Sequence, residues 1–328
     1  MLDSAVGYKK SALILLMLVI GSFVTETGAL QEPHDLFEDG ARIFGSKEKL
    51  RQSLAPIVSI SVRNLPRRVQ LASLVGDRTI SRIRGEYRSD PYRLRKLPAT
   101  LPGLYIDVGA NIGDMVVFAG LMVPQIRIIA VEAMPHLAWL VRYNLFLNGI
   151  DEVACDALSS YKRPRPAACV LNRAVDKEGG NHVRMSLRVN DSQLATVSNK
   201  QTVAGRIYSS VPTISLAQLL EYRLGADPAC GFLRRRIGLC LPKPALQVSL
   251  LKVDCEGCEF EAIPALGNAF QNRTLIPRFA GEVHHSIAFG STMGSQHDKA
   301  SEGATRALFA ALSARGCSTT LKKWEVNC

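Results

Sequence analysis

The fold of this chain is decided by the stretch Tyr105-Ile-Asp-Val-Gly-Ala-Asn-Ile-Gly-Asp114. Residues that favour β-structure run into an acid and then into a Gly-x-Asn-x-Gly turn, which is typical of a strand ending in a tight loop at the start of a helix. Two later apolar segments also end at an acid. Residues 126–131 precede Glu132, and residues 247–253 precede Asp254. Parallel strands present their carboxyl ends to one edge of a sheet, so we expect these acids to converge where open α/β sheets bind ligands.

Apolar segments alternate with segments of helical periodicity, which predicts a doubly wound, mostly parallel α/β sheet. The expected strands cover residues 104–108, 126–131, 167–171, 247–253 and 278–284, with an added strand at 182–189 and one or two short strands at 319–326. The expected helices cover residues 114–121, 135–148, 216–224, 259–266 and 301–314. Nearer the N-terminus, residues 36–54 and 69–83 also have helix-like spacing.

The residues of the loop indicate which cofactor it binds. A dinucleotide-binding loop uses Gly-x-Gly-x-x-Gly, but Asn111 and Asp114 stand at the second and third glycine positions here, and Asp107 precedes the first. Carboxylates at these positions repel a pyrophosphate and attract a cation, which argues against a nicotinamide-dependent oxidoreductase. S-adenosylmethionine carries a sulfonium and an ammonium group, and its ribose suits Glu132, which follows Gly113 at the usual spacing for such a contact. We therefore interpret the loop as a site for S-adenosylmethionine.

Each residue of this site has an expected role. Asp107 would hold the methionine ammonium group, directly or through water, and Asn111 would supply a side-chain hydrogen bond. Gly109 and Gly113 would let the backbone approach the cofactor, and Glu132 would bind the ribose hydroxyls. The alternative for Asp107 and Asn111 is that they only cap the turn. The predicted cofactor-binding residues are Asp107, Gly109, Asn111, Gly113, Asp114, Glu132 and Asp254.

Methyl transfer needs a base more than an activating group, because the sulfonium is already activated. The predicted catalytic residues are His284, Asp254 and Glu282. His284 is the first choice because the unperturbed pKa of histidine lies near neutrality, and it shares a face of its strand with Glu282. A structural histidine is the alternative. The same three residues could hold a divalent metal, but no ligand spacing requires one, so no metal is predicted.

The N-terminal residues have the pattern of a targeting signal, and a buried helix of the globular fold is the alternative. Residues 11–24 form an uncharged apolar run after Lys9 and Lys10, shorter than the ~20 residues that span a bilayer. This pattern predicts a signal peptide or a signal anchor within residues 1–29, and therefore a location in the lumen of the secretory pathway, secreted or membrane-anchored. The sequons at Asn190 and Asn272 agree with glycosylation there.

Eight cysteines also agree with an oxidising compartment. The expected disulfides are Cys230–Cys240 and Cys317–Cys328, while free buried thiols are the alternative. Cys255 and Cys258 have the Cys-x-x-Cys spacing of a redox motif, but the second half of a zinc site is absent, and we do not assign them redox chemistry.

Most of the net charge of +11 lies in one segment. Residues 42–98 contain 14 Lys and Arg against 4 Asp and Glu, a difference of +10. This segment is either a solvated helical surface or a contact for an anionic membrane or an acidic glycan. Nucleic acid is disfavoured as a partner because a protein in the lumen of the secretory pathway would not meet it.

Several segments together resemble the FkbM-type methyltransferases, a family of class I S-adenosylmethionine-dependent enzymes. The matching pieces are Tyr105–Asp114, Val131-Glu-Ala-Met-Pro135 with Asn144 and Asn148, Val211-Pro-Thr-Ile-Ser-Leu216, Leu251-Lys-Val-Asp-Cys-Glu-Gly-Cys-Glu259 and Gly281-Glu-Val-His284. The resemblance implies O-methylation of a sugar or another small hydroxylated acceptor. It also implies a seven-stranded, Rossmann-like methyltransferase sheet with a reversed last strand.

The expected organisation has three parts. Residues 1–29 form the targeting segment, residues 30–100 a basic and mostly helical extension, and residues 101–328 the methyltransferase domain with an insertion at about 225–245. The alternative function is that of a non-catalytic lumenal protein that keeps this fold and binds an acidic glycan or a membrane through its basic segment.

Overall fold

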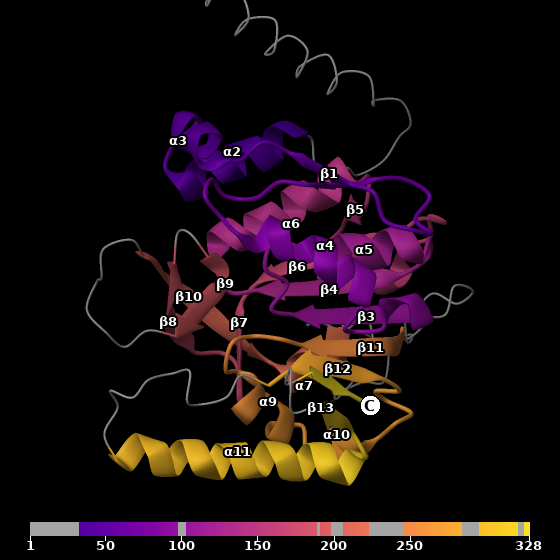
Figure 1. Cartoon of the computed structure of the whole chain (residues 1–328), viewed down its shortest axis with the longest axis vertical. Helices are drawn as coiled ribbons and strands as arrows, with labels where there is room; N and C mark the ends of the chain where they lie inside the picture. Colours follow the sequence, from indigo (N-terminus) through magenta and orange to yellow (C-terminus); the bar gives the residue numbers. More distant parts are fainter. Residues whose placement is uncertain are drawn as a thin grey trace, which may run out of the picture.

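The computed structural model describes residues 33–97, 103–188, 191–197, 206–222, 246–283, 295–320 and 325–328. The main sheet consists of β3 (Gly103–Val108), β4 (Arg127–Glu132), β5 (Asp151–Glu152), β6 (Ala167–Asn172), β11 (Gln247–Val253), β12 (Phe279–Glu282), β13 (Ser318–Thr320) and β14 (Glu325–Asn327). Their order in the sheet is β13-β14-β12-β11-β3-β4-β6-β5 (Figure 1).

The direction of the strands confirms the predicted doubly wound, Rossmann-like sheet. Within this sheet, the neighbouring strands β5, β6, β4, β3, β11 and β12 all pair in parallel. The last strand, β14, runs antiparallel to both β12 and β13, between which it lies, so the reversed last strand is present. Seven strands match the prediction, and the two-residue β5 extends that sheet at its edge.

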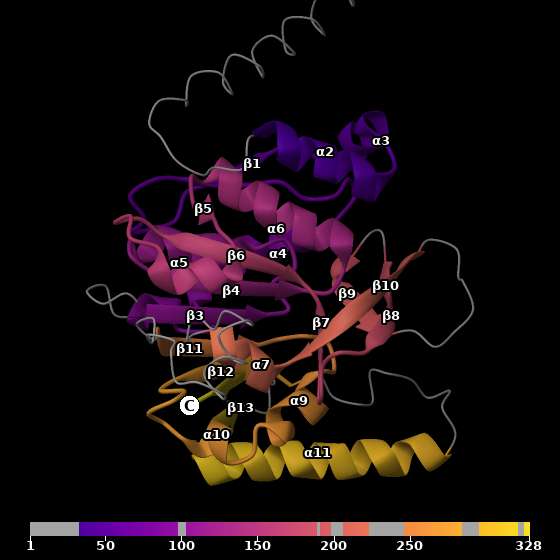
Figure 2. The ribbon, with the colours of Figure 1, turned by 180° about the vertical axis from the view of Figure 1, so that it is seen from behind.

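Helices cover both faces of the sheet, which explains why its central strands are apolar throughout. One face packs against α5 (Asp114–Met122) and α6 (Pro135–Leu147), and the other packs against α7 (Leu216–Glu221), α9 (Glu259–Ala265), α10 (Asn268–Gln271) and α11 (Ser295–Arg315). Successive residues of a strand point to opposite faces, so Tyr105 belongs to the first apolar core and Ile106 to the second. Figures 1 and 2 show α11 at the end of the molecule opposite α2 (Pro33–Phe44).

The basic N-terminal segment is part of the first core. It comprises α2, α3 (Lys47–Ser53), β1 (Val58–Ile60), β2 (Val69–Leu71), α4 (Thr79–Ser89) and the 3₁₀ helix η1 (Leu94–Lys96). The indole nitrogen of Trp139 in α6 donates a hydrogen bond to the Leu36 carbonyl at 2.8 Å. A Cβ added to Gly40 would lie 2.7 Å from the same indole, so α2 and α6 are in close contact. The expected boundary at residue 100 falls outside the described residues.

The prediction of a helix over residues 69–83 is wrong at its start. Val69–Leu71 forms β2, which pairs with β1 and is held by two asparagines of α6. Asn144 accepts from the Ala72 amide at 2.7 Å and donates to the Ala72 carbonyl at 3.0 Å. Asn148, one helical turn later, accepts from the Gln70 amide at 3.0 Å and donates to the Gln70 carbonyl. Asn148 is the C-cap residue of α6, so this helix and its cap supply β2 with hydrogen bonds that a neighbouring strand would otherwise provide.

Replacing Asn144 with alanine should lower the free energy of unfolding by about 3 kcal/mol, measured by urea denaturation. Asn144 is fully buried and also donates to the Ile112 carbonyl at 2.7 Å, so its loss leaves three backbone groups without partners at about 1–3 kcal/mol each. Gln52→Ala is the control, because that amide donates to Glu48 on an exposed surface and should change stability by less than about 0.5 kcal/mol. Similar effects of the two changes would contradict the structural role of Asn144.

A second, smaller sheet lies beside the main one (Figures 1 and 2). It consists of β7 (Ala174–Asp176), β8 (His182–Arg188), β9 (Asp191–Val197) and β10 (Arg206–Ser215), in the order β7-β10-β8-β9. The added strand predicted at 182–189 corresponds to β8, whereas β9 and β10 were not predicted. The insertion expected at 225–245 lies outside the described residues.

Three disulfides join the described cysteines. Cys317–Cys328 confirms one prediction, while Cys155–Cys169 and Cys255–Cys258 were not predicted. Cys230 and Cys240 lie outside the described residues, as does Asn190; Asn272 is exposed. Within the described ranges, which begin at residue 33, no helix combines the length and the apolar composition needed to cross a bilayer.

Candidate functional site

The loop between β3 and α5 is shaped by left-handed backbone and by close packing. Gly109, Asn111 and Gly113 have φ values of 78°, 52° and 82°. A Cβ at Gly109 would lie 1.7 Å from the Asp254 carbonyl oxygen, and one at Gly113 would lie 3.0 Å from Val141 of α6. The two glycines therefore allow β11 and α6 to approach the loop, which is a structural reason for them beside the expected approach of a cofactor.

Glu132 at the end of β4 fixes the loop in place. One carboxylate oxygen accepts from the Asn111 amide and the other from the Met134 amide, both at 2.8 Å. Burial raises the pKa of Glu132 to about 7, although both amide bonds oppose this shift. A carboxylate has about four acceptor positions, so each oxygen retains one for another donor.

Asp107 is held by side chains that sequence reasoning missed. Its two oxygens accept from the Lys252 ammonium and the Tyr105 hydroxyl, each at 2.8 Å. Burial alone would lower the pKa of Lys252, but the carboxylates of Asp107 and Asp254 outweigh it and raise that pKa. Asp107 is fully buried, so its contacts describe an anchor for Lys252, and its direct contact with a cofactor stays a prediction.

Asp114 at the start of α5 is the least compensated acid of the site. Its side chain is 6% exposed, and its buried Oδ2 has no hydrogen-bond partner in the described structure. Burial, with a smaller contribution from the Glu86 carboxylate, raises the pKa of Asp114 to about 8. Lys252 opposes this shift but does not outweigh burial and the Glu86 carboxylate.

Tyr92 connects the two described candidates for the catalytic base. Its hydroxyl lies 2.7 Å from Asp254 Oδ2 and 3.4 Å from Glu282 Oε1. Lys252 lies 5.0 Å from the centre of the Tyr92 ring and 3.7 Å from the Asp254 carboxylate. The structure thus brings Asp254 and Glu282, two of the predicted catalytic residues, to the same hydroxyl group. His284 lies outside the described residues.

These contacts gather carboxyl groups around one buried ammonium group. Electrostatic interactions link Lys252 to acids on β3, α4, α5 and β4 and to the acid that follows β11. The acids are Asp107, Glu86, Asp114, Glu132 and Asp254, with Glu282 joined through Tyr92. Among the described residues this edge of the sheet therefore has a clear excess of acids, and it suits a positively charged ligand.

Two of the missed residues differ in how visible they are in the sequence. Lys252 is a charged residue within an apolar strand, and its pairing partner across the sheet is Asp107. A lysine that is 3% exposed requires such a partner, so this signal was present. Tyr92 comes from the N-terminal segment, 162 residues before Asp254, and no local pattern marks it.

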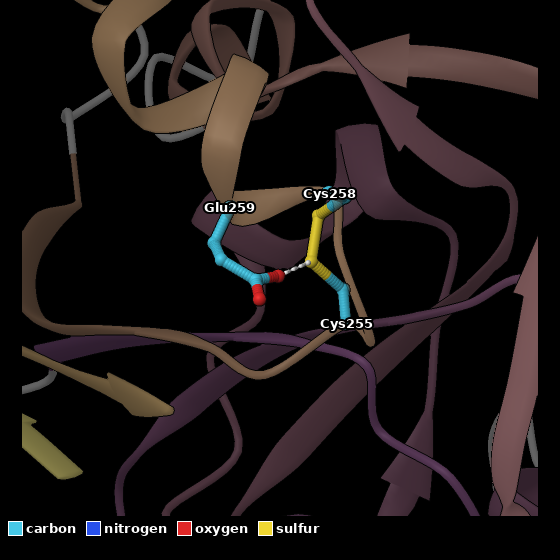
Figure 3. Close-up of side chains that lie close together, drawn as sticks. All are labelled: Cys255, Cys258 and Glu259. Carbon is cyan, nitrogen blue, oxygen red and sulfur yellow. Dashed lines mark hydrogen bonds between the residues drawn. A yellow bond between two sulfur atoms is a disulfide. The ribbon is translucent and has the colours of Figure 1, made fainter. Parts of the chain in front are cut away.

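The Cys-x-x-Cys segment closes the loop that follows Asp254 (Figure 3). Cys255 and Cys258 form a disulfide, and Glu256 and Gly257 between them have left-handed φ values of 54° and 116°. The fully buried Glu259 accepts from the Gly257 amide at 2.9 Å and lies 3.4 Å from the Cys255 sulfur. In the described residues, these two cysteines and Glu259 are the one group with metal-ligand proximity, but the disulfide occupies both sulfurs.

Comparison with known proteins gives weak similarity. No family model and no curated protein matches the sequence. Among solved structures, a precorrin-6Y C5,15-methyltransferase from Geobacter metallireducens shares 12% identity over 74% of this chain and 84% of its own, with a TM-score of 0.34. A proposed O-methyltransferase from Klebsiella pneumoniae shares 12% identity over 96% and 94%, with a TM-score of 0.33. Likeness at this level supports no conclusion about chemistry, so the site itself must carry the assignment.

Proposed function

We propose that this protein is an S-adenosylmethionine-dependent methyltransferase of the FkbM type, which methylates a hydroxyl of a sugar or another small acceptor. The observation that carries the proposal is the buried, unpartnered Asp114 carboxyl oxygen in the loop after β3, within an acid-rich edge of a Rossmann-like sheet. A cationic cofactor would stabilise the ionised form of this carboxyl, whereas the pyrophosphate of a dinucleotide would repel it.

The residues present fit this cofactor. Asp114 would face its positive charge, and the remaining acceptor positions of Glu132 would take the ribose hydroxyls. Asn111 has a left-handed φ value, and its amide donates to Glu132, so the loop backbone is held against the end of β4. When bound, S-adenosylmethionine supplies a methyl group already activated for displacement, so the protein has only to orient the acceptor hydroxyl and remove its proton.

Proton removal is assigned to the Asp254 and Glu282 pair. Tyr92 donates its hydroxyl hydrogen to Asp254 at 2.7 Å and thereby fixes the direction of that carboxylate. Burial, followed by the charges of Asp254 and Glu282, raises the pKa of the Tyr92 hydroxyl, so Tyr92 stays a donor and does not compete as a base. His284, the first choice as base from the sequence, lies outside the described residues, and its role stays a prediction.

The location and partners belong to the same proposal. Residues 11–24 would direct the chain to the secretory pathway as a cleaved signal or an anchor, so the acceptor would be a lumenal molecule such as a glycan. The basic segment of residues 42–98 would contact an anionic membrane or an acidic glycan. A non-catalytic protein with this fold would keep the contact made by the basic segment and would lack cofactor binding.

The test is calorimetric titration of S-adenosylmethionine, and separately of NAD, into wild-type protein and Asp114→Asn at pH 6 and pH 9. The folded-state pKa of Asp114 is raised to about 8, so this carboxyl is protonated at pH 6 and charged at pH 9. Wild-type affinity for S-adenosylmethionine should therefore rise by at least about tenfold between these pH values, and this rise should be much smaller in Asp114→Asn.

The same ionisation has a predictable effect on the unliganded fold. A raised carboxyl pKa contributes stability that is present below the unfolded pKa of 3.8 and is lost as the pH rises through about 8. Glu132 contributes in the same direction between 4.5 and about 7. Cofactor affinity and intrinsic stability should thus change oppositely with pH. Binding of NAD, or no binding of either molecule, would overturn the assignment.

A further inference from the structure

A cavity of about 580 Å³ lies in the basic N-terminal segment, and none of the acids gathered around Lys252 lines it. Its walls come from residues 59–64, from α4 and from η1. Four of its ten lining residues are arginines, and none is acidic. The arginines are Arg63, Arg84, Arg88 and Arg95, and Ser59, Ser61 and Asn64 add further polar groups.

One wall of the cavity is built by buried contacts. Tyr87 is 1% exposed, donates its hydroxyl to the Asp114 carbonyl at 3.1 Å and stacks on Phe118 with ring centres 5.0 Å apart. The Arg95 guanidinium donates to the Tyr87 carbonyl at 2.7 Å and lies 5.2 Å from the centre of the Phe118 ring. Arg95 is therefore held in place beside the cavity before any ligand arrives.

Among the described residues, the other three arginines have no acidic partner. In the parts of the chain that the structure describes, no ion pair joins Arg63, Arg84 or Arg88 to a carboxylate. Arg84 and Arg88 are one turn apart on α4, where like charges destabilise a helix. The acid between them, Glu86, is instead coupled to Lys252 and Asp254. No described carboxylate therefore neutralises the charges of Arg63, Arg84 and Arg88 through an ion pair.

We propose that this cavity binds a sulfate or phosphate ester carried on a sugar. Guanidinium groups present paired N–H donors that match the oxygens of such esters. The volume is within the range of small-molecule sites, about 300–1,000 Å³, and it exceeds what one tetrahedral anion fills, since a water molecule accounts for about 30 Å³. The polar Ser59, Ser61 and Asn64 suit the hydroxyls of the attached ring.

This inference is independent of the proposed methyltransferase activity, because its binding test needs no cofactor. The full chain is titrated with a sulfated disaccharide, alone and in competition with inorganic sulfate. Arg84→Gln/Arg88→Gln should weaken disaccharide binding at least tenfold. The control Arg51→Gln/Arg68→Gln removes the same charge from exposed positions of the same segment, outside the cavity lining, and should stay within twofold of wild type.

A lipid source is distinguished with phosphatidylcholine vesicles that contain phosphatidic acid. If binding to these vesicles requires Arg84 and Arg88 and the disaccharide does not bind, the cavity binds a lipid headgroup and the sugar assignment is wrong. Equal losses of disaccharide affinity in the two double variants would show a diffuse effect of charge, and the proposed site would be wrong. Competition by sulfate, with disaccharide affinity lost selectively in the cavity variant, is the supporting result.

Discussion

Replacing Lys252 with methionine is expected to lower the free energy of unfolding by about 3–5 kcal/mol. The Lys252 ammonium group is 2.8 Å from Asp107, and both side chains are buried. Removing one member of such a pair leaves an uncompensated buried charge, which is the costly case for buried ion pairs. Methionine keeps most of the volume of the lysine stem, so lost packing contributes little to this cost.

A double-mutant cycle separates the charge effect from general damage to the core. Asp107→Asn in the Lys252→Met background removes the orphaned carboxylate, and it should recover a large part of the lost stability. Urea denaturation of the four proteins measures this coupling. Additive losses in the double variant would show that Lys252 and Asp107 do not act as a pair.

Replacing Glu132 with alanine is expected to reduce the affinity for S-adenosylmethionine by more than about 100-fold. Hydrogen bonds to a charged group contribute about 1.5–3 kcal/mol each, and two ribose contacts would be lost, while 1.4 kcal/mol corresponds to a factor of ten. The change also releases the Asn111 amide, which Glu132 binds at 2.8 Å. Calorimetric titration measures the affinity, and circular dichroism checks that the variant is folded.

Two further variants make the Glu132 result specific. Glu132→Gln retains one carbonyl acceptor and should bind with an affinity between wild type and Glu132→Ala. Glu302→Gln removes an exposed acid of α11 and should leave the affinity unchanged. Unchanged affinity in a folded Glu132→Ala protein would show that the cofactor site has been placed wrongly.

The central sheet could be predicted because its signals are local. The strand 247–253 was placed correctly at both ends, and 104–108 and 126–131 within one residue, since buried apolar runs ended at glycines, prolines and acids. Strand β2 could not be predicted in the same way. Its amphipathic residues allow a helix, and what selects a strand is hydrogen bonding to Asn144 and Asn148, more than 70 residues later.

The candidate site shows the same difference between local and long-range signals. Its acids could be predicted, because each follows a strand and parallel strands end at one edge. The partners that set their chemistry could not all be predicted. Tyr92 reaches Asp254 and Glu282 only through the packing of a distant segment. The raised pKa of Asp114 depends on its burial and on Glu86 of α4, neither of which a local sequence pattern shows.

The long reach of Tyr92 also has a consequence for how the chain is made. Its hydroxyl lies beside Glu282, which is 190 residues later, and ribosomes add about 5–20 residues per second. Tyr92 must therefore wait about 10–40 s after its own synthesis before β12 exists to receive it. Until then the segment that carries it cannot reach its final packing, so the acid-rich edge is completed only after β12 has been synthesised.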